Sequence, residues 1–426
     1  MTKQIHLAAH FPGVNNTTVW SDPAAGSHIE FESFRQFAQI AERGKFDFLF
    51  LAEGLRLREQ NGLIYDLDVV GRPDTFTVLA ALAAVTEHVG LTGTINSTFN
   101  EPYEVARQFA SLDHLSGGRA AWNVVTSLNH NQAANHGEER KPTDERYDRA
   151  HEFMEVCRKL WDSWEHDAVV MDREAGVFAD PAKVHRIEHG GRFFKSRGPL
   201  NVVRSPQNGP AILQAGTSAQ GRTFAARYAD AIFAIQPNIA GAKAYYEDIK
   251  RETVRERRKP EACRILFGIQ PILGRTSAEA REKQAIHNAL VPLEGGLAIL
   301  SGHLDFDLSQ IGLDELMAHR TEPQLQRMQA RYRTLTGELL TLREVAQRHG
   351  QSVGLLQMVG TAAEVADQME DYIDQVGGDG FMLSPIYTPG AIEEFVDLVV
   401  PELQRRGRYR LDYAGTTQRD HLMQER

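Results

Sequence analysis

The sequence predicts an α/β fold, a TIM (β/α)8 barrel with insertions, and three observations carry this prediction. Short apolar runs alternate with amphipathic stretches along most of the chain, which is typical of parallel strands separated by helices. The apolar runs are continuous rather than alternating, as expected for strands that are buried on both faces. Eight such pairs can be counted in the 426 residues, and eight is the number of a closed barrel.

The first four strand–helix pairs lie in the N-terminal half of the chain. Each helical stretch spaces its apolar residues three or four positions apart, so that one face can pack on the strands. In chain order the pairs are Ile5–Ala9 with Phe31–Arg43, Phe46–Ala52 with Thr75–Thr86, Val89–Ile95 with Val105–Leu115, and Ala120–Thr126 with Arg146–Trp161.

The last four pairs follow the same pattern, although the seventh strand is separated from its helix by a long segment. The polar tail from Leu411 is expected to be extended or frayed, as chain termini often are. The pairs are Ala211–Gln214 with Ala219–Tyr228, Ala231–Ile235 with Ala240–Arg257, Arg264–Pro271 with Ala362–Val376, and Gly380–Ser384 with Ala391–Arg405.

Two segments break this rhythm and are interpreted as insertions into one barrel domain that spans residues 1–426. The first, about residues 165–206, is rich in Gly, Pro, Asp and His and is expected to be irregular with short strands. The second and largest, about residues 276–357, precedes the last two barrel elements. Part of it is predicted to be a mobile lid over the barrel mouth, with a static helical layer as the alternative. Its expected helices are Ala278–Leu290, Leu325–Thr334 and Thr341–Arg348, and its candidate hinges are Gly295, Gly296, Gly302 and Gly312.

Composition narrows the classes of function. The net charge of −10 and the scattered Lys and Arg residues argue against a nucleic-acid or anionic-membrane surface. The two cysteines, Cys157 and Cys263, lie in apolar-periodic segments and are expected to be buried thiols in a reducing compartment. The N-terminus leads directly into a strand, and no apolar run reaches the length of about 18 residues that could span a bilayer. A soluble, cytoplasmic protein is therefore expected.

Polar residues follow the predicted strands, at the ends that face the mouth of a barrel and carry its chemistry. The group is rich in hydroxyls and amides, and no hydrolase, phosphate-loop or metal-ligand motif accompanies it. Such a lining suits hydrogen bonding to a polar cofactor such as a flavin. Its members are His10, Glu53, Thr94, Asn96, Ser97, Asn123, Thr126, Ser127, Gln214 and Ser384.

The segment AGTSAQGR, residues 215–222, suits a phosphate group. Its small residues allow close backbone approach, and Ser218 stands at the expected N-cap of the next helix, where free N–H groups favour an anion. A plain helix cap is the alternative. Tyr147 in the segment RYDRA either faces the mouth or packs in the core, and His10 is either a ligand contact or a hydrogen-bonded core histidine.

Several longer motifs make this chain resemble the bacterial luciferase-like flavin monooxygenases. They include GKFDFLFLAEG, NEPYEVARQFASLDHLSGGRAAWNVVTS, DERYDRAHEFMEVCRKLW and LQAGTSAQGR. Within that family the chain is similar to the branch of the nitrilotriacetate, dibenzothiophene-sulfone and long-chain alkane monooxygenases. The resemblance implies a TIM barrel with a late insertion. It also implies reduced FMN, supplied by a separate NAD(P)H-dependent flavin reductase, and dioxygen for the oxygenation of an organic substrate.

The family's FMN contacts can be carried over residue by residue. They imply Glu53, Thr94, Thr143, Tyr147 and Ser218 as cofactor-binding residues. Two of these depart from the family pattern. The family usually has Asp where Glu53 stands, and Glu reaches one methylene further. It usually has His where Thr143 stands, so an imidazole is replaced by a hydroxyl.

The remaining expectations concern the substrate and the assembly. Candidate pocket residues are His10, Asn96, Asn129 and His303, and no metal is expected. The resemblance implies a small or medium organic substrate, possibly aromatic or containing sulfur or nitrogen, and a homodimer or homotetramer. Two alternatives keep the fold: a hydride-transferring flavin or deazaflavin oxidoreductase, and a flavin-binding protein without turnover.

Overall fold

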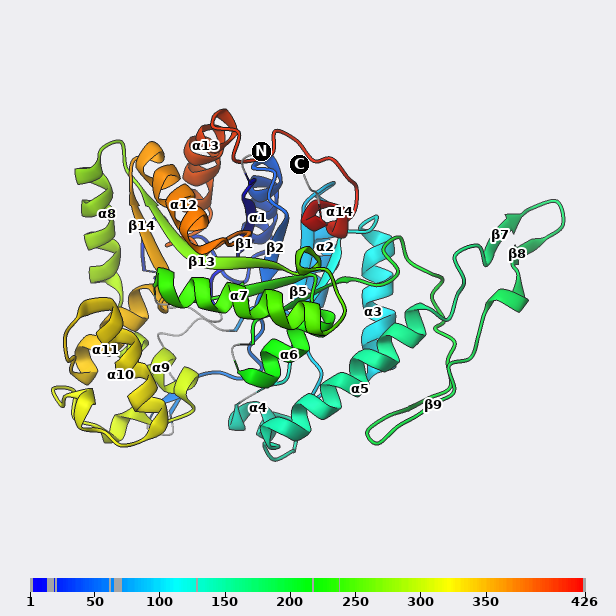
Figure 1. Ribbon diagram of the computed structural model, residues 1–426, viewed down its shortest axis with the longest axis horizontal. Coiled ribbons are helices and arrows are strands. Elements are labelled where there is room, and N and C mark those ends of the chain that lie inside the picture. The colour runs from blue at the N-terminus through cyan, green and yellow to red at the C-terminus, as the bar shows by residue number, and fades with distance from the viewer. Residues whose placement is uncertain are drawn as a thin grey trace.

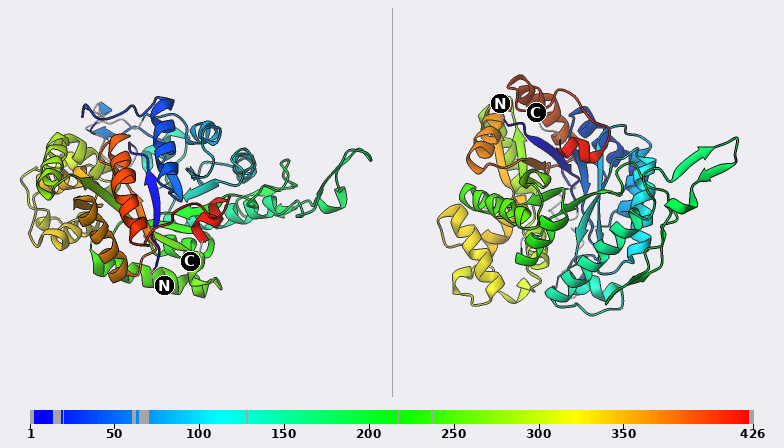
Figure 2. Two further views of the ribbon diagram at one scale, coloured as in Figure 1. Left: turned by 90° about the horizontal axis from the view of Figure 1, so that it is seen from above. Right: turned by 45° about the vertical axis from the view of Figure 1, so that its right-hand side comes forward.

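The computed structural model describes residues 3–13, 19, 21–60, 63–64, 71–127, 129–216, 218–236 and 238–423. Eight parallel strands close into a barrel that helices surround (Figures 1 and 2). The ring closes because the last barrel strand pairs with both the first and the seventh. This confirms the predicted TIM barrel. The barrel strands are β1 (His6–His10), β2 (Phe48–Leu51), β5 (Gly90–Asn96), β6 (Ala120–Val125), β11 (Ala211–Gln214), β12 (Ala231–Ala234), β13 (Arg264–Leu273) and β15 (Gly380–Leu383).

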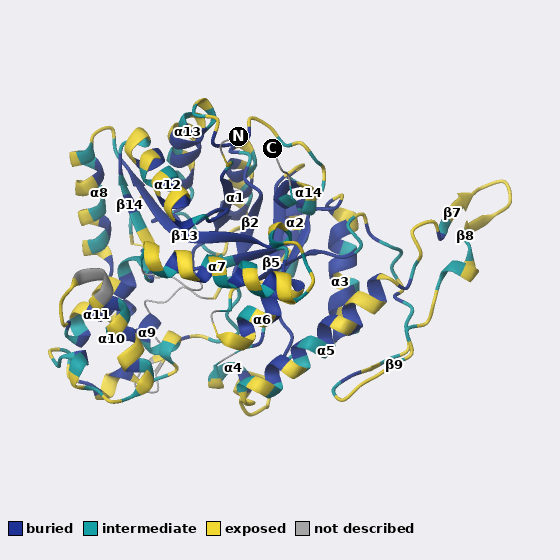
Figure 3. Ribbon diagram, in the orientation of Figure 1, coloured by how far each residue is buried: buried dark blue, intermediate teal, exposed yellow. Residues whose placement is uncertain are grey.

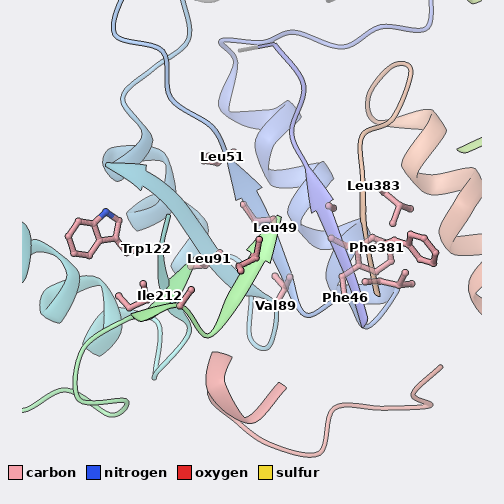
Figure 4. Close-up of a cluster of buried hydrophobic side chains, with 14 of the residues drawn as sticks. Phe46, Leu49, Leu51, Val89, Leu91, Trp122, Ile212, Phe381 and Leu383 are labelled. Carbon is pink, nitrogen blue, oxygen red and sulfur yellow. The ribbon is translucent and has the colours of Figure 1, made fainter. Parts of the chain in front are cut away.

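One helix follows each barrel strand, at the place that the apolar periodicity predicts. Trp122, Leu91, Ile212 and Phe381 belong to the main cluster of buried side chains (Figure 4). The strands are almost fully buried, while the helices keep exposed outer faces (Figure 3). The helices are α1 (Phe31–Arg43), α2 (Thr75–Ala83), α3 (Pro102–Leu115), α5 (Thr143–Trp161), α6 (Ala219–Tyr228), α7 (Ile239–Arg255), α12 (Ala362–Val376) and α13 (Gly390–Arg405).

The C-terminal tail is packed against the barrel, so the expectation of a frayed tail is wrong. The short helix α14 (Gln418–Met423) places Leu422 in a buried cluster with strand residues such as Ala121 and Leu266. Arg264 donates to the carbonyl oxygen of Leu422 over 2.8 Å. Buried polar groups thus anchor a tail whose sequence is mostly polar.

A buried ion pair joins this tail to the N-terminal ends of β1 and β2. Asp47 is 0% exposed and its carboxylate accepts from Arg410 over 2.6 Å, from the Nδ1 of His6 over 2.9 Å and from the backbone N–H of Leu7 over 3.0 Å. Burial alone would raise the pKa of the Asp47 carboxyl, but Arg410 and His6 more than offset it and hold this pKa well below its usual range. The network lies far from the strand ends that form the barrel mouth.

The first insertion is an arm of short antiparallel strands that projects from the barrel (Figure 1). Its irregular character was expected from its composition. Its strands are β7 (Val169–Asp172), β8 (Val177–Ala179), β9 (His189–Gly190) and β10 (Lys195–Ser196). Smaller elements elsewhere are β3 (Glu59–Gln60), β4 (Leu63–Ile64) and α4 (His130–Asn135).

The second insertion is helical and lies to one side of the barrel, at the left of Figure 1, with α9, α10 and α11 below α8. Three of its helices surround a small hydrophobic cluster of their own, which includes Leu300, Met317, Tyr332 and Val345. After it, β14 (Leu356–Gly360) pairs in parallel with the second half of β13, outside the ring. The helices are α8 (Ser277–Leu290), α9 (Leu293–Leu304), α10 (Pro323–Thr336) and α11 (Leu342–Ser352).

Helix α9 corrects the expectation of glycine hinges in this insertion. Gly295, Gly296 and Gly302 lie inside α9 rather than in turns. A Cβ added to Gly296 would lie 2.2 Å from the carbonyl oxygen of Ala346 in α11, and one added to Gly350 would lie 3.0 Å from the Cα of Gly296. Gly296 and Gly350 therefore serve the close packing of α9 on α11, which the sequence pattern does not distinguish from flexibility. Gly312 lies outside the helices and stays a candidate hinge.

Candidate active site

A cavity of about 350 Å³ lies at the C-terminal ends of the barrel strands. Strand ends supply most of its wall, and the second insertion completes it with Gly302 and His303 of α9 and with Val353 and Leu355 before β14. The cavity is within the size range of small-molecule sites, which starts at about 300 Å³. Seven of the nine predicted cofactor and pocket residues line it: His10, Glu53, Thr94, Asn96, Asn129, Tyr147 and His303. Five further polar residues that the sequence placed at the barrel mouth also line it: Asn123, Thr126, Ser127, Gln214 and Ser384.

Two buried amides leave unsatisfied atoms on the cavity wall. Asn123 donates from its Nδ2 to the Oγ1 of Thr94 over 3.0 Å, and its Oδ1 has no partner among the described residues. Asn96 accepts from the backbone N–H of Phe99 over 2.6 Å, and its Nδ2 likewise has no described partner. Buried polar atoms nearly always find a hydrogen-bond partner. This pair thus offers one donor and one acceptor to a polar, amide-like ligand.

His10 faces the cavity from the end of β1. Its Nδ1 lies 3.2 Å from the hydroxyl oxygen of Ser384 at the end of β15. Burial, reinforced by the positive charge of Arg72, lowers the pKa of His10 to about 3. The imidazole is therefore neutral at physiological pH, and it orients a ligand by hydrogen bonding rather than by charge.

Glu53 is the one carboxyl group among the residues that line this cavity. Burial and then the negative charge of Asp74 raise the pKa of Glu53 to about 7, against the opposing effects of Arg72 and of hydrogen bonds from Thr75. The terminal nitrogens of Arg72 are themselves buried and have no hydrogen-bond partner among the residues that the structure describes. Glu53 can therefore carry or release a proton near neutral pH, which suits a group that contacts a cofactor with exchangeable protons.

The start of α6 forms a small cradle beside Tyr147. Ser218 caps this helix, and its hydroxyl oxygen accepts from the backbone N–H of Gly221 over 3.1 Å. A Cβ added to Gly221 would lie 2.8 Å from the hydroxyl oxygen of Tyr147 and 3.0 Å from the Cα of Gly216. Only glycines allow this approach. Free N–H groups of a first helical turn together with a tyrosine hydroxyl make a site for an anion.

Two predicted cofactor residues do not line the cavity. Ser218 stands two residues after Gly216, which lines the cavity, and caps α6 at the cradle just described. Thr143 is the first residue of α5, and its hydroxyl accepts from Arg146 over 3.0 Å. Arg146 in turn donates to the carbonyl oxygens of Thr126 and Ser127, at the end of β6. Thr143 thus holds the start of α5, the helix that presents Tyr147.

Sequence reasoning missed the apolar part of the wall. Phe50, Phe233 and Val125 line the cavity but belong to barrel strands, where apolar residues signal the core. Arg56 was missed because it lies in an irregular loop after β2. The alternation of side chains along a strand could have assigned Phe50 to the barrel interior, because it stands two residues after Phe48.

The described residues contain neither a cluster suited to a metal ion nor a helix suited to span a membrane. No three His, Cys, Asp or Glu side chains gather there in a way that could hold a metal ion. None of the described helices is both long and apolar enough to cross a bilayer. Cys157 and Cys263 are free and buried, as their apolar surroundings predict.

Comparisons with known proteins point in one direction. A family model described as luciferase-like monooxygenase matches residues 11–380. The dibenzothiophene-sulfone monooxygenase of Rhodococcus erythropolis (strain XP) is 43% identical, over 99% of this chain and 96% of the relative. The solved structure of DmoA from Hyphomicrobium sulfonivorans has a TM-score of 0.92 at 34% identity, covering 99% of this chain and 92% of that one. Riboflavin lyase RcaE, solved with modified FMN and its substrate riboflavin, has a TM-score of 0.90 at 33% identity, covering 99% and 96%.

Proposed function

Because the chain belongs to the family of luciferase-like monooxygenases, we propose that it is a two-component monooxygenase that uses reduced FMN. A separate NAD(P)H-dependent flavin reductase supplies the reduced FMN, and one atom of dioxygen enters a small or medium organic substrate. The observation that carries this proposal is the cavity itself. It combines unsatisfied amide atoms with an apolar wall, and the anion cradle adjoins it at Gly216 and Tyr147, which line the cavity.

The residues at the cavity fit FMN in two ways. The cradle of Gly216, Gly221, Tyr147 and Ser218 suits the single phosphate of FMN, since it offers backbone N–H groups and hydroxyls to one anion. The Nδ2 of Asn96 and the Oδ1 of Asn123 suit the donors and acceptors at the edge of a flavin ring. Thr94 and Glu53 extend this polar wall, and Thr143 supports it through Arg146.

The side chains of the cavity bind and orient the ligands and limit the access of water to them. Reduced FMN, when bound, supplies the two electrons with which dioxygen is activated. Neutral His10 offers a hydrogen bond to the substrate, and Glu53 can hold a proton at its carboxyl oxygen near neutral pH. The second insertion adds Gly302 and His303 to the wall, which limits the access of water to the reacting groups. The family resemblance further supports a homodimer or homotetramer.

We infer an organosulfur substrate, with a sulfone as the leading candidate. The relative from Rhodococcus carries its substrate in its name, and it matches this chain over nearly its whole length. The mixed wall of phenylalanines and amides suits such a molecule, because an aromatic sulfone has an apolar body and polar oxygens.

Isotope labelling tests the proposed function. The purified chain is incubated with FMN, NADH, a separate flavin reductase, oxygen-18 gas and a panel of sulfones, sulfides and sulfonates. We expect mass spectrometry to find one oxygen-18 atom in the product of at least one panel member, and none when the reductase or FMN is left out. Turnover that reduces a panel member without incorporating oxygen would replace this proposal with a hydride-transfer function.

A further inference from the structure

Three side chains of the second insertion form a hydrogen-bonded chain that ends at the cavity. The Nδ1 of His303 in α9 lies 2.9 Å from the Nε2 of His349 in α11. The Nδ1 of His349 lies 2.8 Å from the hydroxyl oxygen of Tyr332 in α10. His349 and Tyr332 are buried, at 2% and 3% exposure, whereas His303 is open to the cavity that it lines. Because Nδ1 of His303 faces His349, its Nε2 is the nitrogen left for a ligand.

The imidazoles of His303 and His349 are both neutral. Burial of its ring against the second insertion, followed by the positive charges of Arg58, Arg331 and Arg56, lowers the pKa of His303 below its usual value. Burial and then His303, Arg331 and Arg58 lower the pKa of His349 well below its usual range. A neutral imidazole has one N–H donor and one acceptor nitrogen, so each ring passes on the direction of the hydrogen bond that it receives.

The phenol at the buried end determines that direction. Burial raises the pKa of Tyr332 to about 12, so Tyr332 keeps its proton. A phenol hydroxyl is a good donor and a weak acceptor, and an imidazole nitrogen is the better acceptor of the two. Tyr332 therefore donates to Nδ1 of His349, and the Nε2–H of His349 donates to Nδ1 of His303. The remaining proton of His303 is then on Nε2.

We propose that Tyr332 and His349 are positioning residues that hold His303 in its Nε2–H tautomer, so that His303 donates a hydrogen bond to an oxygen atom of the organic substrate. This inference rests on the proposed function for the identity of the occupant. It narrows the substrate class to compounds with an acceptor oxygen on or beside the reacting atom, such as sulfones or carboxylates. A donating N–H favours such an oxygen atom over an apolar group, because an apolar group would leave this donor without a hydrogen bond.

Nitrogen-15 NMR of the histidine rings tests the tautomer in the whole chain without any ligand. Wild-type protein should show the proton on Nε2 in both His303 and His349, with the His303 signal identified by its loss in His303→Gln. Tyr332→Phe removes the donor at the buried end, and the His303 proton should then move partly or fully to Nδ1. Tyr372→Phe is the matched control, because Tyr372 is also a buried tyrosine, at 6% exposure, but packs in the barrel core. A His303 proton on Nδ1 in the wild type, or no change in Tyr332→Phe, would overturn the proposal.

Two substitutions of His349 separate the positioning role from simple packing. His349→Gln can still accept from Tyr332 with its carbonyl oxygen and donate to His303 with its amide, so the Nε2–H tautomer of His303 should persist. His349→Phe cannot pass on the hydrogen bond, and the tautomer should change. If both variants behaved alike, His349 would be a packing residue only.

Binding of a matched ligand pair links the tautomer to the substrate. In the wild type with reduced FMN, dibenzothiophene sulfone should bind more tightly than dibenzothiophene, which lacks the two oxygens. Tyr332→Phe should weaken sulfone binding by about fivefold to tenfold, the effect of one hydrogen bond, and leave dibenzothiophene and reduced FMN unaffected. Equal binding of the two compounds to the wild type would contradict the inference. If the wild type did not bind reduced FMN, the proposed function would be contradicted instead. The position of the proton on His303, measured by NMR without ligand, would be unaffected by that outcome.

Discussion

Exchanging Tyr147 for phenylalanine and Ser218 for alanine in one variant is expected to weaken reduced-FMN binding by at least about a hundredfold. Each substitution removes one hydroxyl from the cradle at the start of α6, where the hydroxyl of Tyr147 faces Gly221 and that of Ser218 caps the helix. A hydrogen bond to a charged group contributes roughly 1.5–3 kcal/mol, and every 1.4 kcal/mol is a factor of ten in affinity. The measurement is an anaerobic equilibrium titration of the variant and the wild type with reduced FMN.

Two control substitutions separate the loss of phosphate contacts from damage to a helix. Thr276→Ala removes an equivalent N-cap hydroxyl from α8, outside the cavity, and Tyr228→Phe removes a tyrosine hydroxyl elsewhere in α6. Both control variants should bind reduced FMN like the wild type. If the double variant also did so, the phosphate could not lie at Tyr147 and Ser218.

Replacing Asp47 with asparagine is expected to lower the free energy of unfolding by about 3–5 kcal/mol, the typical effect of breaking one half of a buried ion pair. Arg410 is 4% exposed and would lose its charged partner, since Asp47 accepts its hydrogen bond over 2.6 Å. Such a loss is a large part of the stability of a typical protein, which is about 5–15 kcal/mol. Urea denaturation at neutral pH measures it.

The control for this prediction is Asp412→Asn, which breaks the exposed pair of Asp412 with Lys45 and should change the free energy of unfolding far less than Asp47→Asn does. The stabilisation by Asp47 should depend on pH in a defined direction. The pKa of Asp47 is depressed in the folded chain, so its stabilisation is present above the ordinary Asp value of about 3.9 and is lost as the pH falls below it. The difference between wild type and Asp47→Asn should therefore shrink in acid, and a difference that grew there would contradict this description of the network.

Much of the fold could be predicted because parallel barrel strands are buried on both faces. A continuous apolar run such as Phe48–Leu51 has no other stable location, and the helix after it shows its own periodicity. The tail and α9 could not be predicted in this way. The sequence from Leu411 onward is polar, and it packs through single buried contacts such as the 2.8 Å hydrogen bond between Arg264 and Leu422. Gly296 allows α9 to approach α11, a role that only the neighbouring helix reveals.

The cavity was found from the sequence to the extent that strand ends define it. His10, Asn96 and Glu53 follow apolar strands directly, and the barrel geometry brings them together. The physical consequence of having Glu53 and Thr143, where the family usually has Asp and His, becomes clear only from the structure. Glu53 is buried enough to have a pKa of about 7, and Thr143 acts on Arg146 rather than on the cavity. The sequence alone did not predict a role for Tyr332 and His349, because only the fold of the second insertion brings them next to His303.

Binding of three reduced flavins to the wild-type chain tests the proposed phosphate site at the barrel mouth. Anaerobic titrations give the dissociation constants of reduced FMN, reduced riboflavin and reduced FAD. Their order shows whether the barrel mouth binds one phosphate next to the amides of Asn96 and Asn123. Reduced FMN should bind most tightly, because riboflavin has no phosphate for the cradle at Gly216 and Gly221, and the cavity of about 350 Å³ leaves little room for the adenosine of FAD. If reduced riboflavin or reduced FAD bound as tightly as reduced FMN, the cradle could not be a site for the single phosphate of FMN.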